Sequence, residues 1–128
     1  MKIKLLNGAY LPTRGHRTDA GMDLYSTEEK IIGSMEGQTF STGVCIELPH
    51  GTYGKVESRS GLNINNSVVS CGGVIDEGYI GEIKVKLYNF GEKPYEVHRG
   101  DRIAQLVIQA VEHVDLIVTT EEEFDEMA

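Results

Sequence analysis

Ile83-Lys84-Val85-Lys86-Leu87-Tyr88, ending at the turn Asn89-Phe90-Gly91, is the stretch of this sequence that indicates the fold class most directly. Apolar and polar residues alternate along it, and this period of two is typical of a β-strand with one buried face. A second alternation runs from Val44 to Leu48 and ends at Pro49-His50-Gly51. Glycine and proline turns recur along the chain about every eight to twelve residues, which is typical of the short strands of a sandwich or barrel.

We therefore expect one all-β domain over residues 1–128, folded as a jelly-roll-like β-sandwich. A chain of 128 residues has the size of one domain, and no linker or repeat divides it. The one short helix that we expect follows Ser60, whose hydroxyl would cap Gly61–Asn65. A sandwich of this size has exposed sheet edges and a modest core, and oligomerisation would cover both.

The charged residues are distributed unevenly. Lys and Arg total 12 and Asp and Glu total 20, so the net charge is −8. This balance argues against a protein that binds nucleic acid through a broad basic face. Residues 112–128 hold seven acidic residues and no Lys or Arg. We expect this segment to be a solvated, mobile tail.

The two cysteines and the apolar runs indicate where the protein resides. Cys45 and Cys71 have no C-x-x-C spacing and no histidine at metal-ligand spacing, so neither a zinc site nor a disulfide framework is indicated. No apolar run is long enough for a signal peptide or a membrane span. We expect an intracellular protein without a membrane partner, in the cytoplasm of a bacterial cell or of a virus-infected host.

Glycines surround an acid in the segment Gly72–Glu82, GGVIDEGYIGE. Asp76 follows the apolar pair Val74-Ile75, where partial desolvation would suit a general base. The alternative is an aspartate that caps its own turn. Tyr79, three residues later, would stack on a bound ring or sugar, or alternatively pack in the core.

Three further clusters have polar side chains that suit a nucleotide. Arg59, Ser60 and Gly61 combine a guanidinium, a hydroxyl and free backbone amides, which together suit a phosphate, although S-R-S-G is also an ordinary surface turn. Gln105 interrupts an apolar strand, where its amide needs a backbone or a ligand partner. Asp23 would bind hydrated Mg²⁺, or simply begin a strand.

Taken in order, four stretches resemble the first four of the five motifs of the trimeric deoxyuridine triphosphatase (dUTPase) family: DAGMDLYS (19–26), SRSGLN (58–63), GGVIDEGYIGE (72–82) and GDRIAQLVI (100–108). The resemblance implies a jelly-roll homotrimer with active sites at the subunit interfaces. It implies Mg²⁺-dependent hydrolysis of dUTP to dUMP and pyrophosphate, which limits uracil incorporation into DNA and supplies dUMP for dTMP synthesis.

The resemblance also implies the role of each site residue. Asp76 would activate water for in-line attack on the α-phosphorus, and Asp23 would act on Mg²⁺ through water. The ring of Tyr79 would pack against the deoxyribose and exclude a 2′-hydroxyl. The hairpin expected around residues 70–74 would recognise uracil through its backbone groups. Ser70 stands there at a position where many bacterial members have Asn. The residues implied in substrate binding are Arg59, Ser60, Gly61, Ser70, Gly73, Val74, Ile75, Tyr79, Lys84 and Gln105.

The fifth motif of the family does not follow the acidic stretch at residues 121–128. We therefore expect the chain as given to bind dUTP and to turn it over slowly, because the stacking ring and the arginine of that motif are missing. One alternative is a nucleotide-sensing trimer with little turnover. A second is a dCTP deaminase of the same fold, although the strand after the hairpin lacks the pattern expected of that enzyme.

Overall fold

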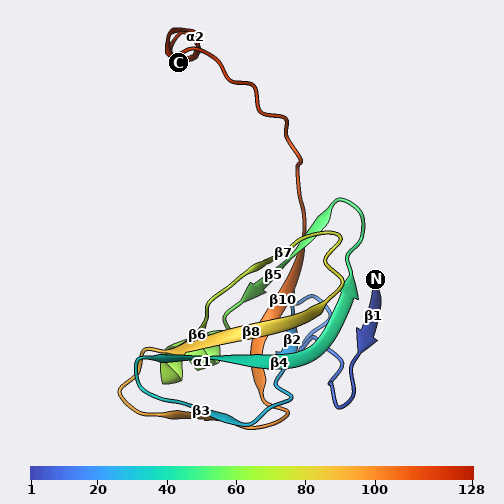
Figure 1. The fold of residues 1–128 in the computed structure, drawn as a ribbon, viewed down its shortest axis with the longest axis vertical. Coiled ribbons are helices and arrows are strands. Elements are labelled where there is room, and N and C mark those ends of the chain that lie inside the picture. The colour runs from blue at the N-terminus through green and yellow to red at the C-terminus, as the bar shows by residue number, and fades with distance from the viewer.

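The computed structural model describes residues 1–128 and has two four-stranded antiparallel sheets and one two-stranded sheet (Figure 1). The first sheet contains, in spatial order, β1 (Lys2–Leu5), β4 (Glu36–Glu47), β8 (Glu82–Asn89) and β6 (Val68–Ser70). The second contains β2 (Gly21–Tyr25), β10 (Arg102–Ala110), β5 (Thr52–Glu57) and β7 (Val74–Ile75). The third pairs β3 (Lys30–Ile32) with β9 (Tyr95–Val97).

Apolar residues from the sheets form one core of 17 buried side chains. On β8, Ile83, Val85 and Leu87 are buried, and Lys84 and Lys86 are exposed, as the alternation predicted. The sequence-based expectation of an all-β sandwich is therefore confirmed.

The alternation predicted for the end of β4 is wrong at Cys45, which is buried like its neighbours Val44 and Ile46. A register shift in the pairing of β4 with β8 lies just before these residues, between Ser41 and Val44. Such a bulge inserts extra residues into one strand and re-aims the side chains that follow. Strict period-two alternation therefore does not describe the end of β4.

Buried polar side chains form hydrogen bonds to the backbone where the pairing between strands is irregular. At the bulge, Thr42 Oγ1 donates to the Ile83 carbonyl at 2.5 Å. Asn89, fully buried at the end of β8, donates to the carbonyls of Ile32 at 3.0 Å and Lys93 at 2.8 Å. Its own side-chain carbonyl accepts from the Gly91 amide at 2.9 Å. No buried side-chain nitrogen or oxygen atom lacks a partner, so these groups add no unpaired polar atom to the core.

The two helices are short. Helix α1 (Ser60–Asn66) lies where the sequence predicted a helix, but its N-cap is Arg59, and no side chain makes a capping hydrogen bond. The prediction that the Ser60 hydroxyl caps the helix is therefore wrong, because Ser60 is already the first helical residue. Helix α2 (Glu121–Asp125) was not predicted. Thr120 caps it by accepting from the Glu123 amide at 3.2 Å, and its first turn is acidic, which favours a helix start.

Beyond β10 the chain leaves the sandwich as an extended segment that ends at α2 (Figure 1). Large apolar side chains along it are exposed, Leu116 and Val118 at 90% and 97%. The mobility expected for residues 112–128 stays a prediction. Neither helix has the length and the apolar composition that a membrane span requires.

Replacing Phe40 by Ala is expected to lower the free energy of unfolding by about 3–5 kcal/mol, because a fully buried ring would leave a cavity. The control is Phe124→Ala, at a ring that is 66% exposed, with an expected change within about 0.5 kcal/mol. Chemical denaturation of both variants at one protein concentration measures the difference. Equal effects of the two substitutions would contradict the assignment of the core.

Candidate functional site

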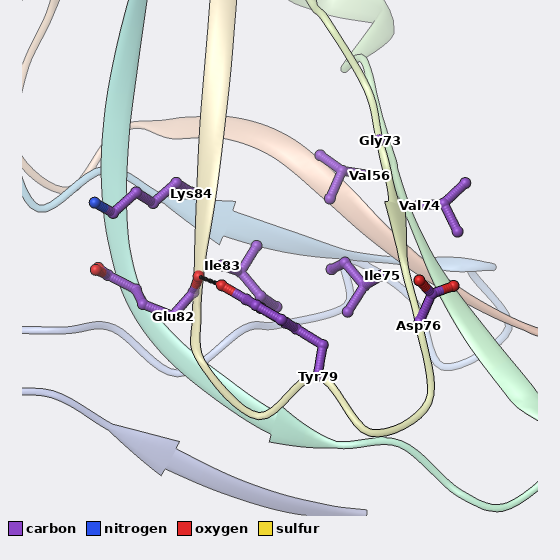
Figure 2. A pocket seen from close by; sticks show the side chains of 9 residues that line it. All are labelled: Val56, Gly73, Val74, Ile75, Asp76, Tyr79, Glu82, Ile83 and Lys84. Atoms are coloured by element: carbon purple, nitrogen blue, oxygen red, sulfur yellow. Dashed lines mark hydrogen bonds between the residues drawn. The ribbon is translucent and has the colours of Figure 1, made fainter.

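The predicted general base lies in a pocket of about 310 Å³ formed by β7, the loop after it and the start of β8 (Figure 2). We call it the hairpin pocket. Its lining residues are Val56, Gly73, Val74, Ile75, Asp76, Tyr79, Glu82, Ile83 and Lys84. The structure therefore brings together six of the residues predicted for the site, in one concave surface.

Pairing of β7 with β5 sets the direction of the side chains around Asp76. Ile75 pairs with Gly54, and the Val56 amide donates to the Gly73 carbonyl at 3.0 Å. Because successive strand residues point to opposite faces, Ile75 lies toward Val56 in the interior and Asp76 points outward (Figure 2). The buried side chain of Ile75 thus anchors the backbone next to Asp76.

The carboxylate of Asp76 is exposed and has no hydrogen bond or ion pair within the chain. The structure therefore does not support the alternative that the Asp76 side chain caps its own turn. The desolvation that we expected for a general base is also not provided by this chain alone. The carboxylate is available to accept a proton from a bound molecule.

Tyr79 lies across the mouth of the loop, and its hydroxyl donates to the Glu82 carbonyl at 2.7 Å (Figure 2). Its amide donates to the Asp76 carbonyl at 3.0 Å, which closes the turn between the two residues. The side chain is 48% exposed, so Tyr79 is not a core aromatic. Tethered at its hydroxyl, the ring presents a surface of fixed orientation to the pocket.

Two predicted residues sit at the margin of this pocket. Lys84 lines it, but its ammonium group points away from Asp76, because Lys84 follows the inward-pointing Ile83 on β8 (Figure 2). Ser70 is not among the lining residues. Its amide donates to the Ser58 hydroxyl oxygen at 2.9 Å, and its own hydroxyl donates to the Gly72 carbonyl at 3.3 Å. The hairpin expected around residues 70–74 is not a paired one, because β6, which ends at Ser70, pairs with β8, and β7 pairs with β5. Ser70 therefore supports the segment that joins two strands of different sheets.

The remaining predicted residues lie in a second pocket of about 410 Å³, which we call the arginine pocket. Its lining residues are Gly15, His16, Asp19, Ala20, Gly21, Asp23, Arg59, Ser60, Gly61, Arg102 and Gln105. The strands β2 and β10 and the start of α1 carry most of them. Arg102 is a pocket residue that sequence reasoning missed, although it lies in the stretch GDRIAQLVI, three residues before Gln105.

Asp23 lies between two guanidinium groups in the arginine pocket. Its Oδ1 is 3.3 Å from Arg59 Nε, and its Oδ2 is 3.7 Å from Arg102 Nη1. One carboxylate beside two guanidiniums gives this cluster a net positive charge, which suits an anion such as phosphate, although Asp19 adds a second carboxylate to the lining of the pocket. The carboxylate is 19% exposed. Mg²⁺ keeps much of its water shell and takes only one or two carboxylates with phosphate oxygens, so this set fits the ion only with substrate present.

Gln105 has a backbone partner. Its Nε2 donates to the Ser58 carbonyl at 3.1 Å, which uses one of the two hydrogens of its amide nitrogen. A Cβ atom at Gly21 would collide with its Oε1, so glycine at this position leaves room for the amide. Gln105 thus holds the segment before Arg59 at the edge of the arginine pocket.

The reactive groups of the two pockets are separated along β5 and the segment that follows it: Val56 in β5 still lines the hairpin pocket, whereas Arg59 lies beyond the end of β5 at Glu57. Ile75 pairs with Gly54, and Arg59 follows five residues later, which is about 17 Å at about 3.3 Å per residue. One chain therefore does not bring Asp76 together with Arg59 and Asp23. The carboxylate and ring lie in one half, and the cations in the other.

Comparisons with known proteins agree on the relationship of this chain. The dUTPase family model matches residues 7–128. A deoxyuridine 5′-triphosphate nucleotidohydrolase from Mycobacterium tuberculosis is 46% identical over 127 residues, which cover 97% of this chain and 81% of the relative. The protein of that name from Clostridium tetani is 46% identical over 119 residues, covering 91% and 82%.

Solved structures of two phage enzymes share the fold. The dUTPase of Staphylococcus bacteriophage 80alpha has a TM-score of 0.88 and 29% identity, covering 94% of this chain and 96% of that chain. A point mutant of the dUTPase from phage phi11 of S. aureus, whose structure reveals the coordination of a structural Mg(II) ion, has a TM-score of 0.87 and 28% identity, covering 96% and 98%. By sequence and by fold, this chain belongs to the dUTPase family.

Proposed function

We propose that this protein hydrolyses dUTP to dUMP and pyrophosphate. The observation that carries the proposal is the hairpin pocket, where the free carboxylate of Asp76 and the tethered ring of Tyr79 share one concave surface. The curated relatives named above are nucleotidohydrolases of this substrate. The reaction limits the incorporation of uracil into DNA and supplies dUMP for dTMP synthesis.

Asp76 acts as the general base. Its carboxylate accepts a proton from water while the water oxygen forms a bond to the α-phosphorus. The bond from the α-phosphorus to the oxygen that bridges to the β-phosphate breaks, and pyrophosphate leaves with that electron pair. Because its lone pairs are not engaged within the chain, the Asp76 carboxylate can accept this proton directly, which supports this role.

The hairpin recognises the uracil and the sugar. The ring of Tyr79 covers the deoxyribose and leaves no space for a 2′-hydroxyl. Gly73 has no positive φ, and a Cβ atom there would meet nothing within 4 Å, so the packing of the chain itself does not require glycine. This open space allows a base to approach the backbone of residues 70–74, close to Ile75.

The arginine pocket binds the triphosphate. Arg59 and Gln105 contact phosphate oxygens, and Ser60 and Gly61 contribute a hydroxyl and backbone amides. Gly61 is a helical residue with open space at its Cβ position, where glycine weakens the helix without a packing reason. Close approach of a phosphate to the backbone supplies such a reason. Lys84 completes the substrate contacts.

The reaction depends on Mg²⁺, which Asp23 would hold through water. When bound, the ion neutralises and orients the triphosphate. The partly buried position of Asp23 beside the phosphate-binding guanidiniums supports this outer role.

The enzyme acts as a homotrimer with each active site at a subunit interface. The separation of the hairpin pocket from the arginine pocket along β5 supports this arrangement, because a second copy must bring an arginine pocket to each hairpin pocket. A neighbouring subunit would also bury Asp76, which is exposed in the single chain. Residues 1–128 form one domain, and residues 112–128 are a mobile tail outside the sandwich.

Asp76→Asn is expected to lower the kcat of pyrophosphate release from dUTP by about 10²–10⁴-fold, because the amide cannot accept the proton. Binding of dUTP should persist. Glu92→Gln, at an exposed carboxyl outside both pockets, is the matched control and should keep wild-type activity. Pyrophosphate release is measured with excess Mg²⁺. A wild-type rate for Asp76→Asn would refute the general-base role.

Tyr79→Ala is expected to raise the ratio of kcat/KM for UTP to that for dUTP by about 10-fold or more, since the group that excludes the 2′-hydroxyl is removed. Tyr79→Phe keeps the ring and loses only the bond to the Glu82 carbonyl, so it should keep most of the discrimination. The measurement is pyrophosphate release from both nucleotides. If Tyr79→Ala discriminates as wild type does, the ring has another role.

Mixing Asp76→Asn with Arg59→Ala subunits tests the shared site. Each variant alone should be inactive, but each site of a mixed trimer takes its hairpin pocket and its arginine pocket from different subunits. After unfolding and refolding together in equal amounts, about a quarter of the sites have both pockets intact, so about a quarter of wild-type activity should return. Without such recovery, the site lies within one chain.

A further inference from the structure

Glu77, the residue after Asp76, is fastened to a distant turn of the same chain. One carboxylate oxygen accepts the Gly51 amide at 2.8 Å, and the other lies 3.0 Å from His50 Nδ1. These partners precede β5 and are 26 and 27 residues away in sequence. The two contacts join the loop between β7 and β8 to the turn at Pro49–Gly51.

That turn is itself firmly attached to the sandwich. The Thr52 hydroxyl donates to the Pro49 carbonyl at 2.6 Å, and the Val111 amide donates to the Gly51 carbonyl at 3.0 Å. Thr52 begins β5, and Val111 follows directly on β10, so both bonds lead into the second sheet. Glu77 is therefore tied to a turn that the second sheet holds through its own hydrogen bonds.

Asp76 needs such support because its own carboxylate has no partner in the chain. On one side, the buried Ile75 holds its backbone in the core. On the other side lies a turn whose Gly78, at φ +101°, has no neighbour within 4 Å of a Cβ position. Glu77 lies between Gly78 and the anchored strand β7. Its side chain makes the hydrogen bonds that link this part of the loop to His50 and Gly51.

We propose that Glu77 is a positioning residue, which holds the Asp76 carboxylate in place for proton abstraction by clamping the loop to the Pro49–Gly51 turn. The proposal rests on the role of Asp76 as general base. Glu77 does not contact the substrate. Its contribution is geometric, since a displacement of about 1 Å at a reacting group lowers a rate by about 10²-fold.

The charges around the clamp keep it closed at neutral pH. The Gly51 amide, and then His50, lower the pKa of Glu77, so it stays ionised well into the acid range. Glu77 raises the pKa of His50 in turn. The other titratable groups at this surface are Asp76, Tyr53 and His113, of which His113 also lowers the pKa of Glu77. The stabilisation that the ionised Glu77 contributes is thus present above the ordinary glutamate range and is lost as pH falls through its lowered pKa.

Glu77→Ala is expected to lower kcat for dUTP by about 10- to 100-fold, with KM within about twofold of wild type. Glu77→Gln keeps an acceptor for the Gly51 amide and should recover most of the loss. Glu96→Ala, which removes an exposed carboxylate beside His98 on β9, is the control and should be unaffected. Steady-state pyrophosphate release gives both constants, and denaturation midpoints show that the variants are folded.

A double variant separates positioning from a general loss of structure. If Glu77 acts only through Asp76, adding Glu77→Ala to Asp76→Asn should not lower the residual rate further. A further loss equal to that of Glu77→Ala alone would overturn the proposal, as would wild-type kcat in Glu77→Ala or no recovery in Glu77→Gln. If Asp76→Asn itself keeps the wild-type rate, the general-base role fails, which is a different result.

Discussion

The central strand β5 is the constraint on which the rest of the site depends. It pairs with β7 at Gly54 and Lys55, which places Ile75 in the core and Asp76 on the surface, and Arg59 follows two residues after its end. The extended strand therefore keeps the hairpin pocket and the arginine pocket apart within a chain. The proposed trimer accounts for this separation, because the arginine pocket of one subunit would meet the hairpin pocket of another.

The loop between β7 and β8, which carries Asp76 and Tyr79, is held at its start, its middle and its end. Ile75 anchors its start in the core, and the Tyr79 hydroxyl bonds the Glu82 carbonyl at its end. Glu77 ties its middle to the turn before β5. The carboxylate of Asp76 and the face of the Tyr79 ring are left free. The Asp76 carboxylate can stay unpaired because Ile75, Glu77 and Tyr79 make the contacts that stabilise the loop.

Much of the candidate site was accessible from sequence because its residues cluster in short stretches with recognisable chemistry. Asp76 and Tyr79 belong to one glycine-rich segment, and Arg59 lies before a predicted helix start. Glu77 and Arg102 were missed, although both lie within those stretches. Their importance depends on partners far away in sequence, namely the Gly51 amide and the Asp23 carboxylate, and no local pattern identifies such pairs.

The sequence by itself determined the all-β class, the position of α1 and the chemistry of four clusters, because alternation, turn residues and motif spacing are local properties. Only the tertiary structure decided that Cys45 is buried and that Asp76 is exposed. It also decided that the predicted site residues divide between two pockets. Strand pairing sets these features, and pairing joins residues whose separation along the chain carries no information about their distance in space.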